Sequence, residues 1–151
     1  GGRTRMLLLA LDRHYRKDGT ADLDRTAFYV PNEYVVRIAE ADSDLFVPVV
    51  SVHPWRKDAL EALGKWADRG VRFVKWIPNT MGIDPSDPDL GPYCDLLRER
   101  GMALITHTGN ELSVVAGRQD YGNPLLLRPV LDRGVTVIAA HSASFGKDVD
   151  L

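Results

Sequence analysis

The stretch ERGMALITH, residues 99–107, decides the fold, because it is the middle copy of a repeat. The other copies are DRGVRFVK at 68–75 and DRGVTVIAAH at 132–141, and each runs from a charged pair through Gly into a short apolar segment. The copies end on Lys75, His107 and His141, spaced 32 and 34 residues apart. A helix–Gly–strand unit of about 30 residues is the βα unit of a parallel sheet. Ligands of such sheets bind at the carboxyl ends of the strands, so the repeat predicts both a fold and a site.

Apolar runs and helical spacing extend this pattern along the chain. We expect strands over 5–11, 46–52, 71–77, 102–106 and 135–140, and helices over 32–41, 58–68, 90–100 and from about 128. We expect the first strand to be buried on both faces, and the segments 78–88 and 108–122 to be long loops. Two α/β folds fit, an open doubly wound sheet or part of a closed barrel of eight strands. No Gly-rich phosphate-binding fingerprint follows any strand, which argues against a nucleotide-binding open sheet.

Composition excludes several classes of protein. The 151 residues are 44% hydrophobic and 26% charged with a net charge of −2, which indicates one globular domain. We expect no nucleic-acid partner, since there is no basic stripe, and no membrane partner, since no apolar run is long enough to span a bilayer. A single cysteine fits a cytoplasmic protein. The chain starts at Gly1 without Met and ends ten residues after His141, so we expect it to be an excerpt of a longer protein.

His107 and His141 are the candidate metal ligands. Each directly follows a strongly apolar strand, and neutral imidazole is the commonest protein ligand for zinc and related ions. Two such histidines on neighbouring strands could converge on one ion. The alternative is that each is a hydrogen-bonded polar group at the end of a strand.

Lys75 is the candidate with the most unusual chemistry. A lysine inside an apolar strand is costly to bury unless it is paired or modified. An ammonium has no lone pair for a metal, but a lysine carboxylated on its nitrogen becomes an oxygen ligand. Lys75 could instead pair with a substrate carboxylate. The structural alternative is a buried lysine paired with a neighbouring Asp or Glu.

Other polar residues are expected to have lesser roles. His53 precedes Pro54 at the end of a strand and is expected to be structural, while Asp12 is expected to form a turn and His14 to be solvated. Cys94 has the helical spacing of a core residue and no nearby base. Arg118 lies beyond His107 and could hold a substrate carboxylate in a bidentate fork, although a lone loop arginine is more often just exposed.

The order and spacing of these motifs resemble the amidohydrolase superfamily of metal-dependent barrel enzymes. The segments are closest to the amidohydrolase-2 group, which includes the aminocarboxymuconate-semialdehyde-type decarboxylases. The resemblance runs over nearly the whole chain, through NEY from residue 32, VVSVHP from 49, GVRFVK from 70, THTG from 106 and AHS from 140.

This resemblance implies a partial (β/α)8 TIM barrel, about strands 2–6, with residues 1–151 as the central fragment of one hydrolase domain. It also implies a divalent metal, commonly zinc, with manganese or iron as other options. His107 would be a metal ligand, and His141 a second ligand or a catalytic histidine. Lys75 matches the strand-four position, which is a carboxylated bridging lysine in some members. The metal-activated water would attack a carbonyl carbon of a small-molecule substrate.

The chain also departs from the family pattern. The His-x-His pair of the first strand and the Asp of the eighth are absent, so we expect the excerpt alone to be inactive and to bind metal poorly. Two other readings stay open: a metal-dependent decarboxylase on the same scaffold, and a non-catalytic α/β domain. Whether the full-length protein is a homo-oligomer is also open.

Overall fold

Five parallel strands follow one another in space in their chain order. The computed structural model describes residues 4–145. The strands are β1 (Met6–Leu9), β2 (Phe46–Val49), β3 (Phe73–Trp76), β4 (Ala103–His107) and β5 (Val137–Ala140). β1 pairs with β2, and β3 pairs with β4, which pairs with β5. One parallel bridge between Val50 and Val74 links the two groups of strands. Sequential parallel order with no reversal is the topology of a barrel and not of a doubly wound sheet.

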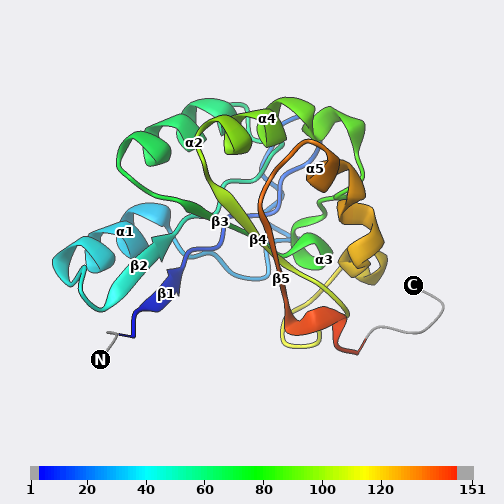
Figure 1. Ribbon diagram of the computed structural model, residues 1–151. Coiled ribbons are helices and arrows are strands. Elements are labelled where there is room, and N and C mark those ends of the chain that lie inside the picture. Colours follow the sequence, from blue (N-terminus) through cyan, green and yellow to red (C-terminus); the bar gives the residue numbers. More distant parts are fainter. Residues whose placement is uncertain (1–3, 146–151) are drawn as a thin grey trace.

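Helices lie outside the strands. They are α1 (Asn32–Ala41), α2 (Ala59–Asp68), α3 (Pro78–Met81), α4 (Gly91–Glu99) and α5 (Arg128–Asp132), with short 3-10 turns at Pro88–Leu90, Gln119–Gly122, Pro124–Leu127 and His141–Ala143. Figure 1 shows α1, α2, α4 and α5 in an arc along the strands. The strands do not close among residues 4–145, so this part of the chain forms a partial barrel.

The core lies between the strands and this arc of helices. Val74, Trp76 and Leu104 point outward from β3 and β4 and pack with Leu63 of α2 and Leu97 of α4. Because side chains alternate along a strand, the neighbouring positions point to the opposite, inner face. The ladder pairs Lys75 with Ile105, and His107 lies two residues further along β4, so Lys75 and His107 share the inner face.

Gly70 ends α2 as the sequence predicts. Its φ is +86°, in the left-handed region that glycine adopts without a steric penalty. On α2, Leu60 is 45% exposed, whereas the buried residues are Ala59, Leu63, Trp66 and Ala67.

The expectation that the first strand is buried on both faces was wrong. Met6, Leu7 and Leu9 are each nearly half exposed, because β1 pairs only with β2 among the described residues. Pro48 lies inside β2, opposite Leu8. Pairing with β3 begins only at Val50, so the missing N–H of Pro48 leaves no gap in that ladder.

Helix α1 begins at Asn32, as expected. The Asn32 side-chain amide exchanges two hydrogen bonds with the backbone of Ser51. Helix α3 falls in a segment predicted to be an irregular loop. None of the helices formed by residues 4–145 has the length and apolar character needed to cross a bilayer.

Candidate active site

His107 is the last residue of β4 and lies buried at the carboxyl end of the sheet. Its Nε2 atom is buried and has no hydrogen-bond partner among residues 4–145. Its Nδ1 atom lies 3.3 Å from Oε2 of Glu111. A carboxylate that accepts from one ring nitrogen fixes the tautomer and leaves the lone pair of the other free, as in histidines that bind metals. The ring nitrogen of His107 that has no partner among residues 4–145 is therefore Nε2.

Glu111 is held firmly in this position. Its Oε1 atom accepts hydrogen bonds from the backbone N–H of Ser113 at 2.6 Å and of Val114 at 3.3 Å, which leaves Oε2 for His107. Burial lowers the pKa of His107 below its usual value, while the charge of Glu111 acts in the opposite direction. The imidazole is thus neutral at pH 7, the form that can bind a metal ion.

His141 directly follows β5, and its ring lies beside that of His107. The ring centroids are 4.8 Å apart and the planes are inclined by 47°. The structure therefore brings together the two predicted histidines. His141 has a φ of +69°, and the next two residues are also left-handed. Left-handed backbone costs about 1–2 kcal/mol for each residue other than glycine. The Thr108 hydroxyl anchors this turn, since it donates to Ala140 O and accepts from Ala143 N.

Lys75 occupies the third position of β3 rather than a strand end, and it is 6% exposed. Burial lowers the pKa of its ammonium to about 8, and the charge of Glu111 only partly opposes this. The predicted structural alternative was an ion pair with a neighbouring acid, and none involves Lys75 among residues 4–145. With a pKa near 8, Lys75 carries more neutral amine near neutral pH than a solvated lysine does.

His53 and Asp12 have structural roles. The Trp55 N–H donates to His53 Nδ1 at 3.2 Å, so Nε2 carries the proton and donates to Met81 O at 2.8 Å. Asp12 accepts from the backbone N–H of His53 and from Arg56 at 3.1 Å. The prediction for His53 is confirmed. The prediction that Asp12 forms a turn was wrong: Oδ1 accepts from the N–H of Arg13, but Oδ2 joins two residues more than 40 positions away, His53 and Arg56.

Three other predictions concern residues outside this cluster. Cys94 is buried in α4, and burial raises the pKa of its thiol to about 11, which fits the predicted core role. His14 was expected to be solvated but is half-buried, with its Nδ1 atom fully enclosed. Arg118 forms a bidentate ion pair with Asp120, with distances of 3.0 and 2.6 Å, so its fork is already occupied.

Asn79 and Gln119 were missed by sequence reasoning. Gln119 bridges the backbone of Glu111, accepting from its N–H at 2.8 Å and donating to its carbonyl at 2.7 Å. The Asn79 side-chain amide donates to Gly109 O and to Gln119, and so ties helix α3 to the loop that carries Glu111. Pro78 at the start of α3 and Gly82 just after it were the available signals, since this pair commonly brackets a helix.

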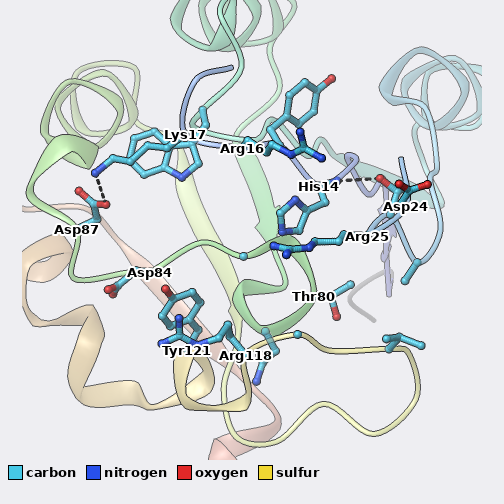
Figure 2. A pocket seen from close by; sticks show the side chains of 18 residues that line it. His14, Arg16, Lys17, Asp24, Arg25, Thr80, Asp84, Asp87, Arg118 and Tyr121 are labelled. Atoms are coloured by element: carbon cyan, nitrogen blue, oxygen red, sulfur yellow. Dashed lines mark hydrogen bonds and ion pairs between the residues drawn. The ribbon is translucent and has the colours of Figure 1, made fainter. Parts of the chain in front are cut away.

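A cavity of about 910 Å³ lies among the loops that follow β1, β2, β3 and β4. Figure 2 shows side chains from these loops converging on it, among them His14, Arg25, Thr80 and Arg118. Lys75, His107 and His141 do not line this cavity. The carboxyl end of the sheet therefore presents two neighbouring features, the imidazole pair and a polar cavity.

The imidazole pair fits part of a metal site. Within residues 4–145 no group of three or more His, Cys, Asp or Glu side chains is placed to hold a metal ion. His107 has the geometry of one ligand, and His141 lies close enough to be a second. Catalytic zinc sites use three protein ligands, so the described residues supply an incomplete set.

Comparisons with known proteins agree with this fold. A family model described as amidohydrolase matches residues 7–147. No curated protein matches the chain. A similar solved structure is an uncharacterised TIM-barrel protein from Bordetella bronchiseptica, with a TM-score of 0.64 and 23% sequence identity. The alignment covers 89% of this chain and 46% of that structure, so the chain spans less than half the length of the barrel that it resembles.

Proposed function

This chain belongs to the amidohydrolase family, and on that premise we propose that it forms the central part of a metal-dependent hydrolase acting on a small molecule. The observation that carries the proposal is the buried, unpartnered Nε2 of His107, whose ring is oriented by Glu111. A buried nitrogen without a partner is costly in a protein, and a metal ion would remove that cost.

Each residue of the cluster has a distinct proposed role. His107 holds the ion through Nε2, and His141 is a second ligand or moves a proton at the reacting carbonyl. The neutral amine of Lys75 can add to carbon dioxide and lose a proton, which gives a carbamate with two oxygen donors. The chemistry supplied by the bound ion is activation of water for attack on an amide, lactone or ester carbon.

The cation we propose is zinc, because two neutral imidazoles suit it, and manganese or iron would fit a carbamate as well. Because the described residues offer an incomplete ligand set, further ligands are proposed to come from outside residues 4–145. The substrate, the reaction and the metal are thus proposals for the full-length protein.

The test is His107→Ala in the full-length protein. We expect loss of bound metal and a fall in turnover of several orders of magnitude, because the variant lacks the ligand nitrogen. Metal content is measured by elemental analysis. His14→Ala is the matched control and should retain its metal, since His14 does not contact the imidazole pair. Normal metal content in the His107 variant would refute the proposal.

Product analysis in labelled water separates the hydrolase from a decarboxylase on the same scaffold. A hydrolase places one oxygen atom from water in its product. Release of carbon dioxide without that oxygen would contradict the hydrolase proposal and favour the decarboxylase.

A further inference from the structure

The turn after β5 holds His141 in backbone that residues other than glycine rarely adopt. His141, Ser142 and Ala143 follow one another with φ values of +69°, +52° and +55°. Strained backbone of this kind persists only where the surrounding structure enforces it, and it is concentrated at functional sites. The contacts that enforce the turn therefore also fix the place of the His141 imidazole.

The left-handed turn brings the rings of His107 and His141 to the same face of the sheet. β4 and β5 pair so that His107 lies opposite Ala140, which places both side chains on the inner face. Because side chains alternate along a strand, an extended chain would point residue 141 to the outer face. The turn instead sets the His141 ring beside that of His107, with the centroids 4.8 Å apart. The contact between the rings therefore depends on the turn.

The buried hydroxyl of Thr108 spans this turn. Thr108 is 2% exposed and directly follows His107 at the end of β4. Its Oγ1 atom donates to Ala140 O at 2.7 Å and accepts from Ala143 N at 3.0 Å. Figure 1 shows the turn beside the segment that follows β4. These two hydrogen bonds bracket His141, so one side chain holds both ends of the left-handed segment.

Gly109 lies directly against the same turn. A Cβ atom at this position would overlap with Ser144 O and would lie 2.7 Å from Ala143 C. Gly109 is itself held by other segments, since its N–H donates to Gly122 O at 2.8 Å and its carbonyl accepts from the Asn79 amide at 3.1 Å. The turn therefore packs on backbone that is fixed from elsewhere in the fold.

We propose that Thr108 and Gly109 are positioning residues that hold the imidazole of His141 against that of His107. One segment of the chain, residues 107–109, then supplies the first imidazole and the support for the second. The inference rests on the proposed function, because it takes His141 to be a working group of that site. Thr108 acts through hydrogen bonds and Gly109 through close contact, so their contributions can be tested separately.

The nuclear Overhauser effect between the His107 and His141 ring protons measures this positioning. It is recorded on the intact protein with labelled histidine, after treatment with a chelator so that no metal ion bridges the rings. Thr108→Val keeps the shape of the side chain but removes both hydrogen bonds, and the effect should be lost. Thr108→Ser keeps the hydroxyl and should restore it. In Thr108→Val the amide hydrogen of Ala143 should exchange about tenfold faster, because it loses its acceptor.

Gly109→Ala is an independent test, and Gly70→Ala is its matched control. The φ values of the two glycines are +89° and +86°, so alanine strains the backbone similarly at both positions. At Gly70 no atom lies within 4 Å of the added Cβ, whereas at Gly109 the Cβ would meet the turn. Both variants should melt at a lower temperature, but only Gly109→Ala should lose the contact between the rings.

The contact between the rings separates positioning from a purely structural role. An intact contact in Thr108→Val or in Gly109→Ala would overturn the inference for that residue, even if the variant melts at a lower temperature. Loss of the contact in Gly70→Ala would also overturn the inference, because general loss of stability would then be enough to displace the ring.

This test and that of the proposed hydrolase can fail separately. The contact between the rings is measured without metal or substrate, whereas His107→Ala tests the hydrolase through its metal content. Intact ring contacts in the Thr108 and Gly109 variants would remove the positioning role and leave the hydrolase standing. Normal metal content in His107→Ala would refute the hydrolase, while the dependence of the His141 ring on Thr108 and Gly109 would stand.

Discussion

Glu111 touches His107 through one carboxylate oxygen and the backbone of its own loop through the other. Glu111→Gln keeps the shape and an acceptor for the loop but removes the charge. We expect metal affinity in the full-length protein to fall about 10- to 100-fold, the usual cost of losing such a supporting partner. Competition with a chelator measures this. Unchanged metal affinity would show that Glu111 only stabilises the backbone of its own loop.

His53 makes stability depend on pH. Burial lowers its pKa to about 3, so the folded protein keeps it neutral while the unfolded chain takes up a proton near pH 6.5. Its stabilising contribution is therefore complete above pH 6.5 and is lost as the pH falls toward 3. Because the pKa values of His14 and His107 are also lowered, they act in the same direction.

Urea unfolding between pH 7.5 and pH 4.5 measures this pH dependence of stability. Stability should fall by about 1.4 kcal/mol per pH unit for each histidine that stays neutral in the fold. His53→Gln should be less stable at pH 7.5 and should show a shallower fall. An identical slope in both proteins would mean that His53 takes up its proton in the folded state.

The positions of some site residues could be predicted from the sequence, and those of others could not. The repeat placed His107 and His141 on neighbouring strand ends, and the structure brings their rings together. An apolar strand around Lys75 predicted its burial. Asp12 and His14 escaped prediction because their surroundings come from distant segments, such as Arg56 and Gly82. The sequence around Asp12 and His14 does not indicate which distant residues contact them.

Helix α2 offers a test at the level of one element. Leu63 is fully buried in the core, while Leu60, one turn earlier, is 45% exposed. Leu63→Ala should cost about 2–5 kcal/mol in the free energy of unfolding, because it leaves a cavity. Leu60→Ala should cost less than about 1 kcal/mol. Chemical denaturation measures the unfolding free energy of both variants. Equal losses of unfolding free energy would contradict this packing.

Substitutions of Gly70 test how helix α2 ends. No atom lies within 4 Å of the position that a Cβ would occupy there, so the cost of a substitution comes from the backbone alone. Gly70→Ala should lower the unfolding free energy by about 1–2 kcal/mol, and Gly70→Asn by less, since Asn tolerates left-handed backbone. Denaturant titration measures both. A neutral Gly70→Ala would mean that φ has shifted from its value of +86°.

The longer helices were predictable from their periodicity. α1, α2 and α4 have nine or ten residues each, enough for helical periodicity to be visible. α3 has four residues and no measurable period, so only its flanking Pro and Gly could have indicated it. Because α3 carries Asn79, the least predictable helix is the one tied to the loop that carries Glu111.

The strands at the two ends of the sheet expose apolar side chains. Leu7 and Leu9 on β1 and Ile138 on β5 are each more than 40% exposed. Unpaired strand edges with apolar side chains promote association. The 151-residue chain should therefore bind a hydrophobic dye and sediment as more than a monomer. Leu9→Ser combined with Ile138→Ser should reduce both effects. Leu60→Ser, an isolated exposed leucine, is the control and should change neither.

The single bridge between Val50 and Val74 divides the sheet into a two-stranded and a three-stranded part. Among the described residues, two backbone hydrogen bonds cross there, from Val50 N to Phe73 O and from Lys75 N to Val50 O. Because the seam is this narrow, we expect β1, β2 and α1 to open locally without unfolding the rest. Amide hydrogens of β2 should then exchange with solvent deuterium through partial opening, whereas those of β4 should wait for global unfolding. The backbone N–H of Lys75 donates one of these two bonds, so each opening would also release the strand segment that carries the buried lysine.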